Sequence, residues 1–330
     1  MKDGIVKVAL YGNGGGHQVW KAYDMPGVEV VGITGVEENA MPENVRGRAP
    51  RYASLEDMVK NSGADIISLC APLRKEQAAL AVWCMEQGLH VYGEKPSAFT
   101  EQELDEIIDV SKRTGRIYHE QAGTYCEAPY CGMRRLVAEG AVGNVICVHS
   151  QKSYPWHDRR PKSEDIDGGL IRQVGIYNMR FTEFIAGVKI SDISARETML
   201  GNDHEDSDCR RAVVFNMTLE NGGVASAIAN YCGPCAPYWD RWGYEYVRVF
   251  GDKGFLEGGN SSGEVTLFQN GIGATKIDVS NERMSFFAAF VEEVRTGKRV
   301  LPMSMEDELS PCRKVIWARN NSILVENHDK

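Results

Sequence analysis

The sequence predicts an α/β protein: an N-terminal, doubly wound parallel sheet followed by an α+β domain with a large, mostly antiparallel open sheet. Three observations carry this prediction. Apolar runs alternate with helical segments in the first third of the chain, a glycine-rich turn follows the first run, and Asn221-Gly222 and Asn270-Gly271 are hairpin signals in the later part. At 330 residues the chain suits two domains. We place them at 1–122 and 123–330, and the last helices can pack back on the first domain.

The first domain is predicted from apolar runs that do not alternate with polar residues, which is typical of parallel strands covered by helices on both faces. A capping box at Thr100-Glu103 begins a helix that ends near Gly115. The predicted strands are 5–11, 28–34, 64–70, 89–92 and 116–121, with helices through 18–22 and over 76–87. Alternation of this kind implies a parallel sheet.

The second domain is predicted from a change to strand-rich sequence. A long helical segment over 169–185 follows the first helix and the first strand of this domain, and hairpin turns then separate the later strands. The predicted strands are 144–152, 191–200, 209–219, 224–231, 244–250 and 264–268, with helices at 128–139, 283–295 and 305–325.

Composition limits the classes of function. A formal net charge of -9 argues against a nucleic-acid or anionic-membrane surface, which would repel the protein. No run of about 18 apolar residues and no signal segment is present, so we expect a cytoplasmic protein. Nine cysteines, an odd number scattered along the chain, indicate reduced thiols. Cys232 and Cys235 have redox-motif spacing but no second pair, so we expect a turn and no metal site.

A glycine-rich turn lies between the first strand and the first helix. Glycines at such a junction let the backbone approach a pyrophosphate and direct free helix N–H groups at it. The turn departs from the usual pattern, because His17 stands where a third glycine is expected. The residues predicted to bind the cofactor here are Gly12, Asn13, Gly14, Gly15, Gly16 and His17.

Glu94-Lys95-Pro96 ends the fourth predicted strand, at the sheet edge where ligands bind in open α/β folds. With four further motifs, it makes the sequence resemble the Gfo/Idh/MocA oxidoreductase family over nearly the whole chain. These motifs are Gly168-Gly169 before the long helix, Asn221-Gly-Gly223, the segment 250–256, and Glu306-Asp307 at the start of the last helix. This family includes glucose-fructose oxidoreductase, inositol dehydrogenase and dihydrodiol dehydrogenase. The resemblance implies a two-domain enzyme that binds NAD or NADP and moves a hydride to or from carbon, commonly in a sugar or cyclitol.

The sequence departs from the family pattern where a catalytic base is expected. Many members carry Asp and His four residues apart on the helix after the Gly-Gly pair, whereas these positions read Gln173 and Tyr177 here. One branch of the family has tyrosine in the His position and pairs it with the Glu-Lys-Pro lysine. A phenol can serve if a nearby ammonium favours its phenolate form. We therefore predict Tyr177 as proton donor or acceptor and Lys95 as its partner, with an ordinary hydrogen-bonded Tyr177 as the structural alternative.

Other site residues follow from position. The acid that binds the ribose in NAD enzymes is absent, because Gly35 follows Thr34, and only Glu37 might reach back. The sequence therefore favours neither NAD nor NADP as the cofactor. The further residues expected to line the cofactor are Thr34, Gly35, Glu37, Ala71, Pro72, Gln77, Glu94, Lys95 and Gln121; those considered for substrate are His119, Trp156, His157, Arg172, Gln173 and Arg180.

The predicted function is an NAD(P)-dependent dehydrogenase or reductase acting on a secondary alcohol or ketone of a sugar-like substrate. One alternative keeps the cofactor but uses transient oxidation for elimination or glycoside cleavage. Another is a regulator that binds the dinucleotide without turnover. The absence of the Asp and His pair favours this alternative, and the presence of Lys95 argues against it. We expect a homodimer or homotetramer formed through the open sheet of the second domain.

Overall fold

The computed structural model describes residues 4–12, 17, 19–121, 123–157, 160–233, 243–260 and 262–326. They form two compact units. The first unit comprises Met1–Ala122, Asp165–Gly168 and Ser285–Ser310, and the second comprises Gly123–Glu164, Gly169–Met284 and Pro311–Lys330. Each unit is described by itself below.

The first unit contains a five-stranded parallel sheet, as predicted, in the order β2-β1-β3-β4-β5. Its strands are β1 (Val6–Tyr11), β2 (Val28–Thr34), β3 (Ile66–Leu69), β4 (His90–Glu94) and β5 (Tyr118–Gln121). The order reverses between β1 and β3, and ligands of doubly wound sheets bind beyond the carboxyl ends of the strands at such a point.

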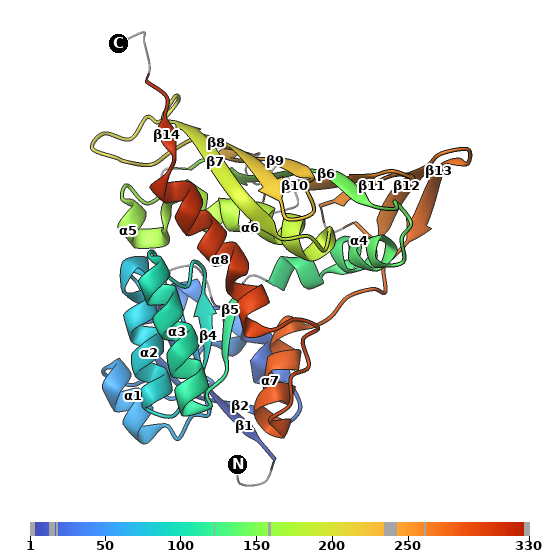
Figure 1. Ribbon diagram of the computed structural model, residues 1–330. Helices are drawn as coiled ribbons and strands as arrows, with labels where there is room; N and C mark the ends of the chain where they lie inside the picture. Colours follow the sequence, from blue (N-terminus) through green and yellow to red (C-terminus); the bar gives the residue numbers. More distant parts are fainter. Residues whose placement is uncertain are drawn as a thin grey trace. The chain divides into compact units, whose positions relative to one another are not determined.

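Helices cover both faces of this sheet (Figure 1). The predicted capping box is confirmed at Thr100, whose side chain accepts from the Glu103 N–H while Glu103 bonds back. The helix predicted through 18–22 is instead a short 3₁₀ turn, and α1 was not predicted. The helices are η1 (Trp20–Asp24), η2 (Glu38–Ala40), η3 (Glu43–Val45), α1 (Leu55–Asn61), η4 (Arg74–Glu76), α2 (Gln77–Glu86), α3 (Glu101–Thr114) and α7 (Phe286–Thr296).

Helix α7 supplies an aromatic cluster on the face opposite α2 and α3 (Figure 1). The ring centroid of Tyr92, on β4, lies 5.2 Å from that of Phe287 and 5.7 Å from that of Phe290. Because aromatic rings bury large apolar areas, this cluster fixes a C-terminal segment on the N-terminal sheet.

The second unit contains a nine-stranded sheet in the order β13-β12-β11-β10-β6-β9-β8-β7-β14. It is mostly antiparallel, as predicted, and the β6–β9 and β7–β14 pairs are parallel. Strands β11, β13 and β14 were not predicted, and the helix predicted over 305–325 ends at Asn320, before β14. The strands are β6 (Val145–Pro155), β7 (Ile190–Thr198), β8 (Ala212–Leu219), β9 (Val224–Gly233), β10 (Tyr244–Gly251), β11 (Gly254–Gly259), β12 (Glu264–Gln269), β13 (Gly273–Asp278) and β14 (Ile323–Leu324).

Helices pack on one face of this sheet (Figure 1). They include η5 (Gly123–Cys126) and α4 (Ala128–Ala138), followed by a segment with two π-helical turns, η6 (Ile171–Gly175) and η7 (Phe181–Ile185), on either side of α6 (Ile176–Arg180). The long helix predicted over 169–185 is therefore present but not regular. Two further helices, α5 (Glu164–Asp167) and α8 (Met305–Asn320), contain residues of both units.

Candidate active site

The first strand ends in a glycine that the packing requires. Gly12 has φ +78°, and a Cβ atom there would lie 2.0 Å from the carbonyl oxygen of Cys70 at the end of β3. The backbone of the turn thus lies directly on the next strand, at the point where the strand order reverses. This close approach fits a dinucleotide pyrophosphate beside the glycine turn. The predicted contacts Asn13, Gly14, Gly15 and Gly16 lie outside the described residues.

His17 bonds the Gly12 backbone as part of a directed chain of hydrogen bonds. Its Nε2 lies 2.6 Å from the Gly12 carbonyl oxygen, which only accepts, so Nε2 carries the proton. Nδ1 then accepts from the Ser68 hydroxyl at 2.8 Å, and Ser68 accepts from the Gln121 amide at 3.0 Å. Burial lowers the pKa of His17 to about 4, so the ring is neutral at pH 7. His17, Ser68 and Gln121 therefore link the Gly12 backbone to β3 and β5.

Lys95 follows β4 at the carboxyl edge of the sheet, and only 3% of its surface is exposed. Hydrogen bonds hold the backbone at Lys95 and two residues later. Arg74 donates to the Lys95 carbonyl oxygen at 3.1 Å. Two residues later, the N–H and hydroxyl of Ser97 both donate to one carboxylate oxygen of Glu120, at 2.8 and 2.7 Å. The Lys95–Pro96 peptide bond is cis.

The loop after β3 is supported by a side chain that we predicted to line the cofactor. Gln77 accepts from the Ala71 N–H and donates to the Leu69 carbonyl oxygen, both at 2.9 Å. The Gln77 amide thus supports the backbone of the loop that contains Ala71 and Pro72. Glu94 is buried beside Lys95 at the same edge of the sheet.

The end of β2 brings together residues that bear on cofactor choice. Thr34 is buried and its hydroxyl donates to the Tyr52 carbonyl oxygen, whereas Gly35 and Glu37 are exposed. Arg51, which sequence reasoning missed, is drawn to this strand end by a parallel bridge with Ile33. Its guanidinium donates to the Val36 carbonyl oxygen at 2.8 Å and lies 2.5 Å from Glu38.

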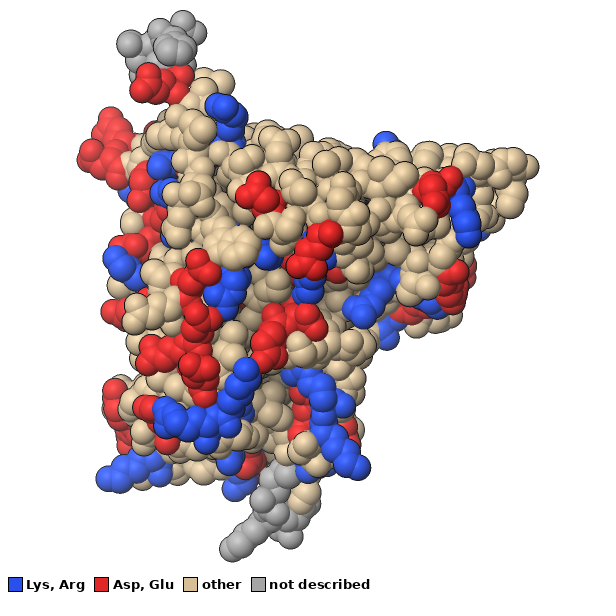
Figure 2. Space-filling view, viewed as in Figure 1, with Lys and Arg blue, Asp and Glu red and all other residues tan. Residues whose placement is uncertain are grey.

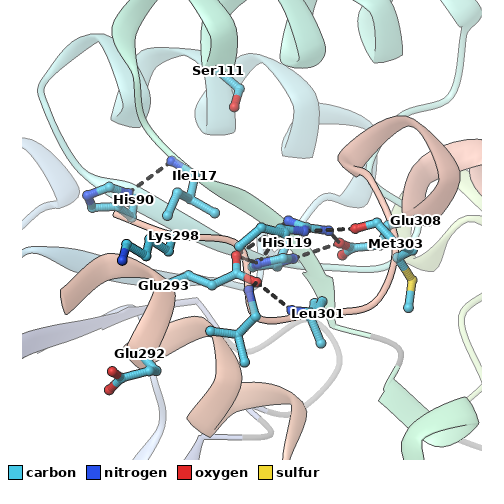
Figure 3. Close-up of polar contacts among 12 residues, drawn as sticks. His90, Ser111, Ile117, His119, Glu292, Glu293, Lys298, Leu301, Met303 and Glu308 are labelled. Atoms are coloured by element: carbon cyan, nitrogen blue, oxygen red, sulfur yellow. Dashed lines mark hydrogen bonds and ion pairs between the residues drawn. The ribbon is translucent and has the colours of Figure 1, made fainter. Parts of the chain in front are cut away.

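His119 lies at the centre of a buried charge network in the first unit (Figure 3). Its Nδ1 is 2.7 Å from Glu308 and its Nε2 is 2.9 Å from Glu293. Arg299 bonds both carboxylates, at 3.0 and 3.4 Å. Burial alone would lower the pKa of His119, but the two carboxylates outweigh it and the pKa is raised. Both ring nitrogens are occupied, which argues against the substrate contact we expected of His119.

Tyr177 lies in the second unit, where α6 packs on the inner face of β6 and β9. It is 5% exposed, and its ring meets that of Tyr154 edge-on at 6.2 Å. Asn178 anchors the helix by donating to the Ser150 hydroxyl at 3.0 Å. Gln173 is also buried, but it lies in a π-helical turn, so the α-helical i, i+4 spacing that we assumed between positions 173 and 177 does not apply.

The other predicted substrate residues have partners within the second unit. Arg172 lies 3.4 Å from Glu164, which argues against its free use for an anionic group. Arg180 stacks on the Tyr125 ring at 5.2 Å. Trp156 donates to Asp203 at 2.9 Å and carries Arg211 over its ring at 4.0 Å, while His157 is next to residues outside the described ranges.

Opposite charges alternate on the surface of the first unit. Lys112 of α3 lies 2.6 Å from Glu306, and Arg113 lies 2.8 Å from Glu86. Figure 2 shows acidic and basic side chains interspersed over this face. In the described part of the chain, no helix has the length and apolar character to cross a bilayer.

Comparison with known families matches both units separately. Residues 6–122 match the oxidoreductase-family model of an NAD-binding Rossmann fold, and residues 130–257 match the GFO/IDH/MocA C-terminal domain. The chain belongs to the Gfo/Idh/MocA oxidoreductase family. The resemblance predicted from Glu94-Lys95-Pro96 is thus confirmed.

Curated relatives of this Gfo/Idh/MocA protein are dehydrogenases and reductases. It is 25% identical over 286 residues, 80% of each chain, to a 1,5-anhydro-D-fructose reductase from Ensifer adhaerens. It is 24% identical to a trans-1,2-dihydrobenzene-1,2-diol dehydrogenase from Xenopus laevis over 149 residues, 44% of each chain. The chain thus aligns with less than half the length of that dehydrogenase.

Solved structures share the fold of both units. An oxidoreductase structure from Thermotoga maritima has a TM-score of 0.85 at 23% identity, covering 96% of this chain and 97% of that one. A 3-ketoreductase from Actinomadura kijaniata, in complex with NADP and TDP-benzene, has a TM-score of 0.78 at 15% identity, covering 97% and 99%. At these identities the likeness concerns the fold.

Proposed function

We propose that this protein is an NAD(P)-dependent oxidoreductase that acts on a secondary alcohol or ketone of a sugar, cyclitol or related compound. The observation that carries the proposal is the buried Lys95 at the carboxyl edge of a sheet that belongs to an NAD-binding family. Arg74 bonds its carbonyl oxygen, and Glu120 bonds Ser97 two residues later. The names of the curated relatives support the substrate class.

The nicotinamide, when bound, accepts or supplies the hydride. In the oxidation direction the alcohol loses a hydride from carbon and a proton from its hydroxyl, and the C–O bond becomes a carbonyl. Tyr177 takes that proton, and in the reverse direction it donates it. Lys95 binds the reacting oxygen and stabilises the negative charge that develops there.

Cofactor reduction provides the first test. Purified protein is incubated with NAD or NADP and a panel of sugars and inositols, and the absorbance of reduced nicotinamide is followed. We expect turnover with at least one substrate. Cofactor binding with release of water or aglycone and no net reduction would favour the elimination mechanism, and binding without any turnover would favour a regulator.

Two substitutions test the proposed roles. Lys95→Ala and Tyr177→Phe should each lower kcat by about 100-fold or more, which is the usual contribution of a group that stabilises a developing oxyanion and of a general acid or base. Lys75→Ala and Tyr246→Phe are matched controls, because Lys75 is exposed and paired with Asp165 and Tyr246 accepts a bond from Arg248 on the outer sheet face. Full activity of Tyr177→Phe would remove Tyr177 from the mechanism.

We also propose self-association through the outer face of the second sheet. Phe255 pairs across the sheet with Phe250 and Phe268, with ring centroids 5.1 and 4.3 Å apart. Val224 of β9 continues the same cross-strand row through Cys147 of β6 and is exposed. Such an apolar row favours a symmetric contact with a second copy. Light scattering should give a dimer or tetramer, reduced to a smaller species by Phe255→Asp; an unchanged mass would contradict the proposed interface.

A further inference from the structure

A buried ion pair lies on the inner face of the second sheet, directly beneath the helical segment that carries Tyr177. Lys152 of β6 stands opposite Glu245 of the neighbouring strand β10, and the two side chains form a salt bridge. They are only 6% and 5% exposed. Both belong to the same unit as Tyr177, so their relation to it does not depend on the first unit.

The ammonium of this pair is in contact with the proposed proton donor. Lys152 Nζ lies 4.5 Å from the ring centroid of Tyr177 and 5.3 Å from that of Tyr154. A positive charge at this distance in a water-poor interior favours the phenolate form of a tyrosine. Glu245 holds the ammonium in position and reduces the field that Tyr177 experiences.

The pattern of the sheet indicates that the pair is not needed for packing. Neighbouring inward positions of these strands are apolar or small: Val148 and Ser150 precede Lys152 on β6, and Val247 and Val249 follow Glu245 on β10, all fully buried. An apolar pair of similar volume would be at least as stable in such a place, because burying two charges costs solvation. The charged pair thus occupies inward positions at the place where β6 passes beside Tyr177.

Other titratable and charged groups lie near this segment or near the pair. Burial, and after it the Glu245 carboxylate, raise the pKa of Tyr130 on α4. Arg160 lies 4.2 Å from the Tyr231 ring centroid and 5.6 Å from that of Tyr154. On the helical segment itself, Arg172 pairs with Glu164 and Arg180 stacks on Tyr125.

We infer that Lys152, held by Glu245, is a positioning residue that sets the ionisation of Tyr177 for proton transfer. The inference rests on the proposed function, in which Tyr177 exchanges a proton with substrate. It adds a second ammonium to the mechanism, supplied by the sheet beneath Tyr177 and independent of Lys95.

Two substitutions of opposite sign test the inference. Lys152→Met should move the pH at which Tyr177 ionises, and the matching limb of the kcat profile, upward by about one pH unit. Glu245→Gln leaves the ammonium without its counter-ion and should move both downward. Lys152→Arg keeps the charge and should restore the wild-type profile. Because the two effects oppose each other, a general loss of stability cannot imitate them.

A spectroscopic measurement separates this inference from the proposed function. The tyrosinate absorbance of each variant is titrated with pH, and the signal of Tyr177 is obtained by subtracting the same titration in a Tyr177→Phe background. If Tyr177→Phe keeps full turnover, the proposed role of Tyr177 fails, yet the titration still reports whether Lys152 controls its ionisation. Lys152→Met and Glu245→Gln titrations that both coincide with wild type would overturn the inference, and if one variant fails to fold, the other decides alone.

Discussion

The Nδ1 atom of His119 lies 2.7 Å from a carboxylate oxygen of Glu308, a residue 189 positions later in the chain. Carboxylates only accept hydrogen bonds, so a protonated ring can donate to Glu308 and Glu293 at once. With Arg299, two positive groups then balance two negative ones. This network joins the end of β5 to two C-terminal segments of the first unit.

The first prediction concerns stability against pH. The raised pKa of His119 means that its contribution is complete below its ordinary value of 6.5 and is lost as the pH rises through the folded-state pKa. The pKa of Glu293 is about 2, held down by His119 and two backbone N–H groups against the effect of burial. Its contribution is complete above 4.5 and is lost as the pH falls towards 2. The contribution of this network to stability should therefore be greatest between pH 4.5 and pH 6.5.

Replacing His119 tests this directly. His119→Leu leaves two carboxylates, each 1% exposed, without their buried cation, and should cost about 3–5 kcal/mol in the free energy of unfolding. It should also remove most of the decline in stability above pH 6.5. His90→Gln is the control, because burial lowers the pKa of His90 to about 4 and it carries no proton in that range. The free energy of unfolding is measured with urea at several pH values. The same decline above pH 6.5 in His119→Leu and in wild type would contradict the assignment.

The second prediction concerns the glycine turn. Gly12→Ala should weaken NAD(P) binding by about tenfold or more, because the new Cβ must move the turn away from the Cys70 carbonyl oxygen. Gly63→Ala is a matched control with the same kind of backbone, φ +66°, and no atom within 4 Å of its Cβ. It should cost about 1–2 kcal/mol of stability and leave binding unchanged. Cofactor fluorescence measures the affinity of both variants for NAD(P). Equal affinities of Gly12→Ala and Gly63→Ala would show that the turn does not bind the cofactor.

The third prediction concerns cofactor choice. Glu38 occupies the guanidinium of Arg51 beside the end of β2, and both side chains are about half exposed. Glu38→Ala frees a planar fork suited to phosphate and removes a negative charge. The KM for NADP should fall by about fivefold, the equivalent of about 1 kcal/mol, with little change for NAD. Glu43→Ala, a nearby exposed carboxylate, should alter neither KM, and a similar effect of both variants would point to net charge alone.

The parallel sheet and its carboxyl edge could be predicted because they depend on local signals. Unbroken apolar runs, the Thr100 capping box and the strand ending at Glu94-Lys95 need no knowledge of distant residues. The regular helix expected over 169–185 was wrong in detail, since nothing in its sequence marks the π-helical turns on either side of α6. The strand β13 was missed because its side chains are nearly all exposed and lack an apolar alternation.

The partners of site residues could not be predicted, because they come from far along the chain. His119 was expected near substrate, since nothing in its surroundings points to Glu293 and Glu308, which lie more than 170 residues away. Arg51 reaches β2 through a loop whose path the sequence does not specify. One signal was available: Lys152 and Glu245 fall on positions that strand alternation places inside, where a charge requires a partner.

The last prediction concerns how Lys95 is held. Glu120→Ala removes the carboxylate that binds both the N–H and the hydroxyl of Ser97, and Tyr118 also donates to that hydroxyl, at 2.7 Å. The loop after β4 then loses its anchor to β5, so kcat should fall by about tenfold while the KM for cofactor stays nearly constant, since the glycine turn is untouched. Glu120→Gln keeps an acceptor oxygen and should recover most of the activity. Ser97→Ala keeps the N–H bond and should have an intermediate effect. A Glu120→Ala enzyme that is less stable but has wild-type kcat would mean that Glu120 supports the fold without positioning Lys95.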